Sequence, residues 1–316
     1  MYEEELPIQA PKLWCYNIDK ISDALVYNGF YEIKTFSFLD KNTAQLFADE
    51  AELINLQDSS VEFSSLRPTI VASHLKAIKN AQNKSQKNSK FFEIGKCFRN
   101  EQGRVVERMV LALTMSEKST SRNWAKPQKD VSVFDVKSIL ERLLNMLGIN
   151  YRLQTSALDY YHPGRSGTYI YQKDTVLAHF GEIHPNLLVK MDINVPVVCF
   201  ELFLDSIPEF AEQKDKKPLE ISQYQPTTRD FSFVVKKSIS AADIINAVKK
   251  LRIDEIQNMK IFDVYESETL GEGSKAVAFE LLLQSRKSTL SDDRITEISN
   301  MVSESIKKNC NGHLRT

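Results

Sequence analysis

The sequence lacks an excess of charge of either sign. Its 41 lysines and arginines face 42 aspartates and glutamates, so the formal net charge is -1. This balance excludes a polybasic DNA-coating protein and an acidic disordered tail. It does not exclude a nucleic-acid partner, because a neutral chain can still carry a basic face. The 316 residues, 42% of them hydrophobic, predict about two domains, each long enough to bury its own core.

Long apolar runs and secretion signals are also absent. No run of about 18 apolar residues is present, so no membrane span is predicted. Residues 1–5 are acidic where a secretory signal would be basic and then apolar. Cys15, Cys97, Cys199 and Cys310 lie far apart and form no Cys-x-x-Cys pair, which argues against a disulfide framework or a zinc ribbon. These absences favour a cytoplasmic protein with reduced thiols and without a metal site.

Common catalytic loops are missing as well. The sequence has no phosphate-binding Gly-x-x-x-x-Gly-Lys-Ser/Thr loop, no Gly-x-Gly-x-x-Gly and no Gly-x-Ser-x-Gly. The run from His162 to Ser166 pairs two residue types used in nucleophilic catalysis. No aspartate can be assigned as the orienting partner, and Pro163-Gly164 explains the run as a turn. A tight turn with a hydrogen-bonded histidine is therefore the preferred interpretation.

Helical spacing begins near the N-terminus. Residues 17–28 predict a helix in which Ile18, Ile21 and Leu25 share one apolar face. Gly29 follows where a left-handed residue often ends a helix. This apolar face can cover the chain's own sheet or meet another subunit, and the pattern alone allows both.

The rest of the first two-thirds alternates helical and strand patterns. Further helices are predicted from Pro68, with proline in the first turn, and at residues 134–147. A polar tip at residues 100–103 predicts a hairpin between two apolar runs. The predicted strands are residues 31–38, 91–98, 105–115, 168–180 and 195–204. Short hairpin connections outnumber long crossovers, so the predicted sheet is antiparallel.

A change of pattern marks the second domain. Residues 211–218 are charged, lack large apolar residues and end in proline, as expected of a linker. After it, strands are predicted at residues 230–235, 258–266 and 275–283 and around Leu314, with helices at residues 240–251 and 291–308. Ser291 is the expected N-cap of the last helix. This βαββαβ order is the ferredoxin-like arrangement.

Several motifs in this tail resemble one known domain. They are Tyr224-Gln225-Pro226-Thr227-Thr228-Arg229-Asp230-Phe231, Ile261-Phe262-Asp263-Val264-Tyr265-Glu266, Ser288-Thr289-Leu290-Ser291-Asp292-Asp293 and Gly312-His313-Leu314-Arg315. The series resembles the ferredoxin-like anticodon-binding domain that closes the β subunit of bacterial phenylalanyl-tRNA synthetase. Upstream motifs resemble that subunit's catalytic-like module: Ser65-Leu66-Arg67-Pro68, Phe91-Phe92-Glu93-Ile94-Gly95-Lys96, His162-Pro163-Gly164-Arg165-Ser166 and Gly181-Glu182-Ile183-His184-Pro185.

The resemblance implies an α+β fold in two parts. Residues 1–210 are expected to form an antiparallel-sheet module like that of class II synthetases, but non-catalytic. Residues 211–221 are the expected linker, and residues 222–316 the ferredoxin-like βαββαβ anticodon-binding domain. The family's β subunit is much longer, so the chain is expected to be its C-terminal part.

The resemblance also implies the function. The expected role is to scaffold the catalytic α subunit and to bind the anticodon region of tRNA-Phe during ATP-dependent attachment of phenylalanine to tRNA. The implied partners are the α subunit and tRNA-Phe, in an α2β2 enzyme without DNA or membrane contacts. ATP and magnesium are used by the full enzyme, and no cofactor is expected in this chain.

No catalytic residue is predicted in the chain itself. Class II synthetases hold ATP between two arginine clamps, whose planar groups bind phosphate oxygens at two points. Arg99, Arg104 and Arg108 superficially match the first clamp, although solvated charges at a hairpin explain them equally well. Residues 197–205, which match the second clamp, contain neither glycine nor arginine. Phosphate charge in an adenylation transition state would therefore lack compensation.

Two sets of contact residues are predicted. The tRNA-binding set is Arg229, Lys275, Arg286, Lys287, Thr289, His313 and Arg315. The set for the interface with the α subunit is Ile18, Ile21, Leu25 and Phe30. Phe231 and Phe233 alternate along a strand and are expected in the core instead of stacking on bases.

Other observations limit the tRNA-binding prediction. Ser288 stands where the family usually has a basic residue, and Ala276 where serine often follows the lysine. Residues 220–316 contain 14 basic and 14 acidic residues, so this domain is neutral and any RNA contact there must be local. Two alternatives stay open: a stand-alone class II-like adenylating enzyme, and a protein-interaction module without RNA binding.

Overall fold

The computed structural model describes residues 13–315 apart from 58, 87, 121, 126, 156–157, 208–220 and 268–269. The chain divides into two units, Met1–Lys216 and Lys217–Thr316. Apart from Ile221, the predicted linker lies outside the described residues. Among the described residues, no helix has the length and apolar character needed to cross a bilayer.

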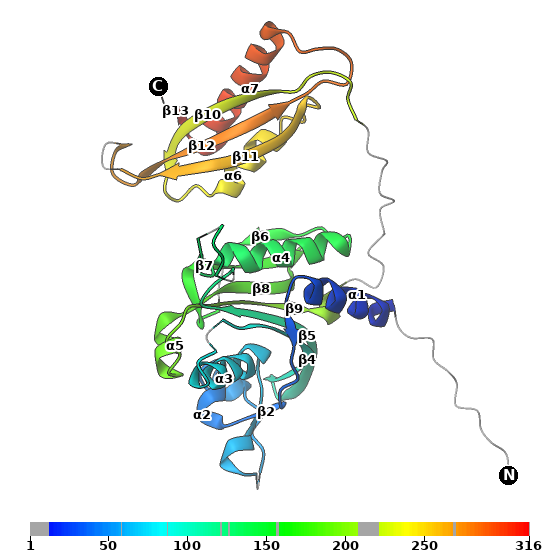
Figure 1. The fold of residues 1–316 in the computed structure, drawn as a ribbon, viewed down its shortest axis with the longest axis vertical. Coiled ribbons are helices and arrows are strands. Elements are labelled where there is room, and N and C mark those ends of the chain that lie inside the picture. Colours follow the sequence, from blue (N-terminus) through cyan, green and yellow to red (C-terminus); the bar gives the residue numbers. More distant parts are fainter. Residues whose placement is uncertain are drawn as a thin grey trace, which may run out of the picture. The chain divides into compact units, whose positions relative to one another are not determined.

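The first unit is built on a seven-stranded sheet with the order β1-β4-β5-β9-β8-β7-β6 (Figure 1). Its strands are β1 (Tyr31–Glu32), β4 (Lys90–Glu101), β5 (Arg104–Ser116), β6 (Arg152–Gln154), β7 (Tyr161–Tyr171), β8 (Thr175–Ile183) and β9 (Val197–Phe203). The predicted antiparallel sheet is confirmed for every neighbouring pair except β1 and β4, which are parallel.

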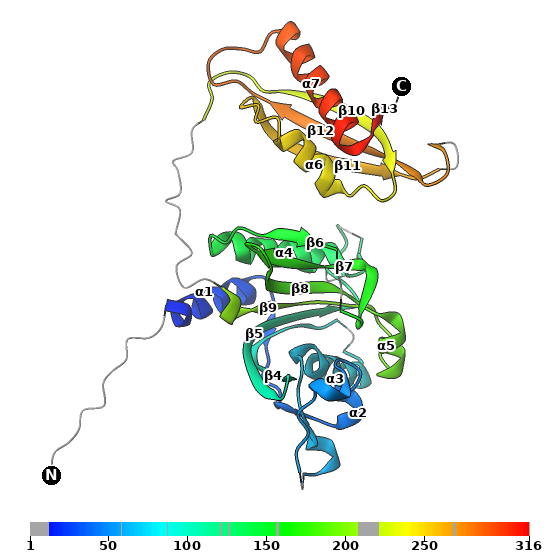
Figure 2. The same cartoon turned by 180° about the vertical axis from the view of Figure 1, so that it is seen from behind.

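Helices cover both faces of this sheet. They are α1 (Leu13–Tyr27), α2 (Lys41–Ala44), α3 (Ile70–Asn83), α4 (Val133–Met146) and α5 (Pro185–Lys190), with 3-10 turns η1 (Glu50–Glu52), η2 (Val61–Phe63) and η3 (Leu204–Ser206). Buried residues of α1 and α4 pack with one face, and those of α3 and α5 with the other. Figures 1 and 2 show these layers from opposite sides.

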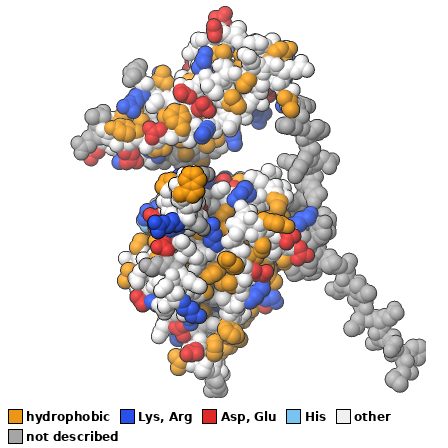
Figure 3. Space-filling view, viewed as in Figure 1, with side chains coloured by type: hydrophobic (Ala, Val, Ile, Leu, Met, Phe, Trp, Pro, Cys, Tyr) orange, Lys and Arg blue, Asp and Glu red, His pale blue; other side chains and the backbone are white. Residues whose placement is uncertain are grey.

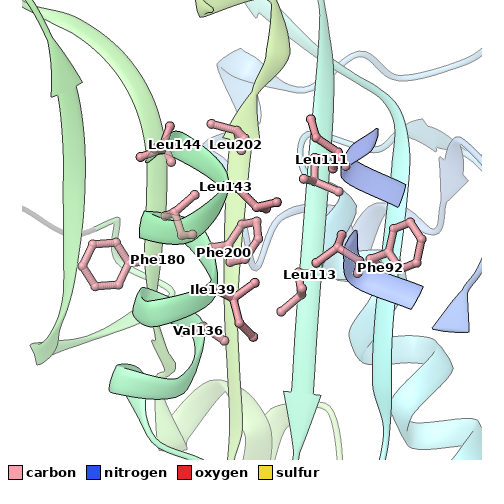
Figure 4. Packing of buried hydrophobic residues seen from close by; sticks show 14 of the residues in the cluster. Phe92, Leu111, Leu113, Val136, Ile139, Leu143, Leu144, Phe180, Phe200 and Leu202 are labelled. Atoms are coloured by element: carbon pink, nitrogen blue, oxygen red, sulfur yellow. The ribbon is translucent and has the colours of Figure 1, made fainter. Parts of the chain in front are cut away.

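Strand β9 is covered by helices on both of its faces. Phe200 and Leu202 point into the core under α1 and α4, as Figure 4 shows. The alternate residues Val197 and Cys199 pack under α3 and α5. Because both faces are covered, every residue of β9 is buried.

Local chemistry explains several predicted boundaries. Gln102 and Gly103 have φ angles of 53° and 83°, as the two-residue turn of the predicted β4–β5 hairpin requires. Gly29 and Gly148 have φ angles of 80° and 70° just after α1 and α4, which confirms them as helix ends. The prediction for Pro68 was wrong by two residues. The Thr69 side chain caps α3 by accepting a hydrogen bond from the Val71 backbone, so the helix begins at Ile70.

Two strand predictions were also wrong. Residues 31–38 do not form one strand: β1 ends at Glu32, and Phe38 starts the separate strand β2 (Phe38–Leu39), which pairs with β3 (Ser65–Leu66). Residues 168–180 belong to two strands, β7 and β8, joined by a turn in which Gln172 has a φ angle of 53°. In both cases alternating β-prone residues continue past the point where backbone pairing changes.

The second unit has the predicted βαββαβ order. Its elements are β10 (Thr227–Lys236), α6 (Ala241–Lys249), β11 (Ile256–Tyr265), β12 (Ser274–Leu283), α7 (Asp292–Cys310) and β13 (His313–Leu314). The sheet order β11-β12-β10-β13 places the first and third strands of the unit in the centre. Ser291 caps α7 as predicted, by accepting a hydrogen bond from the Arg294 backbone. The ferredoxin-like arrangement is confirmed.

Candidate nucleic-acid interface

The sheet of the second unit has two unlike faces. Phe231, Phe233 and Phe279 stack on one another and pack with buried residues of α6 and α7. The expectation that Phe231 and Phe233 belong to the core is therefore confirmed. Both helices lie on this side of the sheet (Figures 1 and 2). The described residues place no helix on the opposite face.

Strand register identifies the residues of that open face. Ala276 pairs with Val234 on one side and with Tyr265 on the other, and Val234 pairs with His313. Directly paired residues share a face, so one row crosses all four strands from Tyr265 to His313. A second row contains Ala278, which pairs with Ser232 and Asp263. Val234 and Ala276 in the centre of the first row are 5% and 3% exposed, so the accessible surface lies at the edges, on Tyr265 and His313, and along the second row.

One cation–π contact lies on this surface. The Arg315 guanidinium lies 5.4 Å from the centre of the Tyr265 ring, which is 45% exposed. The Arg315 backbone N–H donates to the Ser232 carbonyl at 2.7 Å, which holds the end of the chain against β10. An exposed ring beside a guanidinium is an arrangement on which a nucleic-acid base can stack.

The predicted tRNA-binding residues fall into two groups. Lys275, His313 and Arg315 lie at the end of the sheet where Val235 pairs with Lys275. Lys275 is half-buried, and its ammonium donates to the Lys237 carbonyl at 3.1 Å. His313 and Arg315 are exposed, and both belong to the open face.

The second group lies at the other end of the sheet. Arg229 is exposed and, by strand alternation, shares the side of Phe231, where its guanidinium donates to the Thr228 carbonyl at 3.0 Å. Arg286, Lys287 and Thr289 are exposed in the segment after β12. Arg229 lies six residues from Val235 along β10, so about 20 Å separates the two groups.

Sequence reasoning left Tyr265 out of the predicted contact residues. Aromatics in strands usually face the core, and the pattern of β11 does not separate its two sides. The edge position of β11, which follows from the βαββαβ order, was the available clue. Phe262 is 55% exposed on the same strand, at an irregular register between Ile261 and Asp263.

The predicted subunit-interface residues are mostly internal. Ile21, Leu25 and Phe30 are 1%, 1% and 4% exposed and belong to the core under α1, while Ile18 is half-buried. Their apolar groups therefore cover the chain's own sheet, which is one of the two roles that the sequence allowed. Exposed apolar groups on this part of the chain are instead Val26, Tyr27 and Tyr31, at 54%, 88% and 72%.

The His162 run has a structural explanation. His162 Nδ1 accepts a hydrogen bond from the Gly164 backbone at 3.1 Å, and the Ser166 hydroxyl donates to the His162 carbonyl at 2.7 Å. The run lies within β7, where the register with β8 shifts between Tyr161 and Ser166. The hydrogen-bonded histidine is confirmed, but the expected tight turn is a strand irregularity.

The arginine of the Ser65–Pro68 motif supports the fold. Arg67 and Glu93 are both 2% exposed, and their charged groups lie 3.0 Å apart. Burial alone would raise the Glu93 pKa, but His74, the Thr35 hydroxyl and the Arg67 charge outweigh burial and lower it to about 2. Arg67 also donates to the Lys96 carbonyl at 2.8 Å, so it joins the segment before α3 to β4.

Comparison with known families separates the same two parts. Residues 222–315 match the family model of the ferredoxin-fold anticodon binding domain, which assigns the second unit to a class of RNA-binding modules. Residues 8–204 match the model described as the phenylalanyl tRNA synthetase beta chain CLM domain. The chain therefore belongs to the phenylalanyl-tRNA synthetase beta chain family.

Curated relatives carry the same name. The phenylalanine–tRNA ligase beta subunit of Bartonella quintana (strain Toulouse) is 30% identical over 301 residues, covering 92% of this chain and 37% of that protein. That of Paramagnetospirillum magneticum is 32% identical over 298 residues, covering 92% and 37%. The chain thus spans little more than a third of the length of these relatives. Among solved structures, a pyrrolysyl tRNA synthetase of Desulfitobacterium hafniense aligns at 20% identity and a TM-score of 0.47, covering 61% of this chain and 66% of that one.

Proposed function

We propose that this chain is the tRNA-binding and assembly portion of a phenylalanine–tRNA ligase beta subunit. The second unit binds the anticodon region of tRNA-Phe, and the first unit scaffolds the catalytic α subunit. The full enzyme is a cytoplasmic α2β2 assembly that attaches phenylalanine to tRNA with ATP and magnesium. The single observation that carries the tRNA-binding role is the open sheet face on which Arg315 lies against Tyr265.

The open face supports contact with unpaired bases. Single-stranded loops are recognised by stacking on aromatic rings and guanidinium planes, and Tyr265 and Arg315 supply both. His313 lies beside them on the open face and adds a donor for base edges or phosphates, whereas Lys275, paired with the core residue Val235, faces the helix side at the same end of the sheet. Arg229, Arg286, Lys287 and Thr289, about 20 Å away, contact the backbone farther along the anticodon arm.

Local contacts suit the charge distribution. Residues 220–316 contain equal numbers of basic and acidic residues, so long-range attraction to RNA is weak. In the space-filling view, charges of both signs are interspersed on the visible surface of the second unit (Figure 3). Stacking and hydrogen bonding therefore provide most of the affinity.

A footprint of tRNA-Phe in the presence of the chain tests this role. We expect protection confined to the anticodon arm, with affinity that decreases as salt concentration rises. Protection of the acceptor arm alone, or salt-independent affinity, contradicts the proposal. Absence of tRNA binding favours a protein-interaction module instead.

Assembly with the α subunit is tested separately. The exposed Val26, Tyr27 and Tyr31 provide apolar surface beside α1 for this contact. We expect the chain to bind purified α subunit in analytical ultracentrifugation, and separate sedimentation of the two would contradict the assembly role. The chain alone should show no ATP–pyrophosphate exchange with phenylalanine, because β9 contributes neither glycine nor arginine. Clear exchange would support a stand-alone adenylating enzyme.

A further inference from the structure

A cavity of about 210 Å³ lies in the first unit, where β4, β5, β8 and β9 meet the start of α3. It is independent of the open face in the second unit. Arg99 and Arg108 of the β4–β5 hairpin contribute to its walls, together with His179 and Phe203. Glu201 and Tyr160 also line it.

Glu201 is a fixed carboxylate in this cavity. It is 3% exposed, and its Oε1 accepts a hydrogen bond at 3.0 Å from the Ile70 backbone at the start of α3. Its Oε2 accepts a hydrogen bond from the Tyr160 hydroxyl at 3.2 Å. Both carboxylate oxygens therefore have a hydrogen-bond donor, one from the first turn of α3 and one from Tyr160.

Each of the two arginines is oriented by a glutamate at the wall of the same cavity. Arg99 Nη1 donates to Glu52 Oε2 at 3.0 Å, and Arg108 Nη2 donates to Glu101 Oε1 at 2.6 Å. The Arg108 guanidinium also lies 5.6 Å from the centre of the Phe203 ring. A guanidinium has five N–H donors, so each arginine can bind its glutamate and a ligand carboxylate together.

The pKa of His179 indicates that the charges of Arg99 and Arg108 both reach the same part of the cavity. Burial, followed by the charges of Arg99 and Arg108, lowers the His179 pKa to about 4. The Thr168 hydroxyl lies 2.9 Å from His179 Nδ1 and fixes the ring. The imidazole is therefore neutral at neutral pH and adds a polar but uncharged wall.

Size and charge together define the ligand class. The volume lies below the range of about 300–1,000 Å³ typical of drug-sized ligands, which excludes a nucleotide. The lining carries carboxylates from Glu52, Glu101 and Glu201 against two guanidinium groups, so its formal charge is slightly negative. The three carboxylates would repel a free anion. A small zwitterion adds no net charge, and it can place its negative group near the arginines and its positive group near the glutamates.

We propose that this cavity binds a small α-amino acid, with its carboxylate between Arg99 and Arg108 and its ammonium group toward the glutamates. The site lies on the sheet face that adjoins α3 and uses residues that the tRNA-binding role leaves unassigned. Its amino-acid binding requires neither tRNA nor the α subunit.

Isothermal titration calorimetry of the full chain tests the site. The ligands are glycine, L-alanine, L-valine and L-phenylalanine, with N-acetyl-L-alanine, L-alaninamide and inorganic phosphate as probes of each charge. We expect at least one amino acid to bind and both blocked derivatives to bind about tenfold more weakly or worse. No amino-acid binding up to about 10 mM overturns the proposal. Equal binding of N-acetyl-L-alanine or phosphate also overturns it, because the site would then be a simple anion site.

Matched variants locate the binding site. Arg108→Gln should weaken amino-acid binding about tenfold, since one carboxylate partner is lost. Arg104→Gln, on the same hairpin but outside the cavity, should leave binding unchanged. Val106→Phe fills the cavity from the hairpin without changing its charge and should abolish binding. Normal amino-acid binding by both Arg108→Gln and Val106→Phe would overturn the assignment.

Discussion

The guanidinium of Arg315 lies 5.4 Å from the centre of the Tyr265 ring, although Arg315 follows β13 and Tyr265 ends β11, strands at opposite edges of the sheet. β12 and β10 lie between them and present small residues, Ala276, Ala278 and Ser232, on the same face. A long arginine side chain can therefore extend across the sheet toward the tyrosine. The last described residue thus completes a surface that begins 50 residues earlier in the chain.

Replacing Tyr265 tests base stacking. Tyr265→Leu should weaken binding of a tRNA-Phe anticodon stem-loop by about 1–3 kcal/mol, because a base loses its aromatic platform. Tyr265→Phe keeps the ring and should retain most of the affinity. Fluorescence anisotropy with a labelled stem-loop measures both. Equal losses in the two variants would show that the hydroxyl, not the ring, makes the contact.

Arg315 and Arg229 separate the two groups of predicted contacts. Arg315→Gln should weaken binding and remove protection of the anticodon loop, because the cation beside Tyr265 is lost. Arg229→Gln should reduce the salt dependence of binding by about one phosphate contact and leave loop protection intact. Salt titrations combined with footprinting measure these effects. Loss of loop protection in Arg229→Gln would contradict this division.

The buried pair of Arg67 and Glu93 should be important for the stability of the first unit. Glu93→Gln leaves the Arg67 charge without its buried partner and should lower the free energy of unfolding by about 3–5 kcal/mol. Glu107→Gln breaks an ion pair with Lys96 in which both side chains are about half exposed, and should cost less than about 1 kcal/mol. Far-UV circular dichroism during urea denaturation measures both losses. Similar losses in the two variants would contradict the importance of burial.

Protonation of His179 should make the first unit pH-dependent. Its pKa is lowered to about 4 from the ordinary histidine value of about 6.5, so the unfolded state binds a proton at higher pH than the folded state. Stability is therefore full above about pH 6.5 and decreases as the pH falls toward 4. We expect a loss of about 2 kcal/mol between about pH 7 and pH 4.5. Denaturation midpoints for the original chain and His179→Gln measure it, and an unchanged pH dependence in the variant would exclude His179 as the cause. Glu93, with a pKa of about 2, adds a further loss only below about pH 4.5.

Two residues of helix α1 allow stability and assembly to be tested separately. Leu25→Ala should lower the free energy of unfolding by about 2–5 kcal/mol, because it creates a cavity in the core. Tyr27→Ala removes a side chain that is 88% exposed and should leave stability nearly unchanged while weakening association with the α subunit. Urea denaturation and sedimentation velocity measure the two effects. Unaltered association in Tyr27→Ala would place the interface elsewhere.

Local patterns in the sequence were sufficient for much of the fold. The hairpin at residues 101–104, the glycines after α1 and α4, and the Ser291 cap depend on neighbouring residues only, so composition and spacing predicted them. The start of α3 required knowledge of which hydroxyl caps it, Thr69. The break between β1 and β2 depends on which strand each residue pairs with, and such pairing leaves little trace in one segment.

The candidate nucleic-acid interface was likewise only partly predictable from the sequence. The sequence indicated His313 and Arg315 as contacts because both lie in a short terminal motif. It did not identify Tyr265, since a strand residue is equally able to face the core or solvent until the sheet's covered side is known. The cavity beside Glu201 could not be predicted from the sequence either, because its lining residues range from Glu52 to Phe203 along the chain.

The near-neutral charge, the βαββαβ order and the family motifs were determined by the sequence itself, because each is a property of residue identity and local spacing. The tertiary structure alone decided that Ile21 and Leu25 cover their own sheet and that Arg315 meets Tyr265. Burial and long-range contacts depend on which faces the fold brings together. That choice minimises exposed apolar surface over the whole unit, so no single segment contains it.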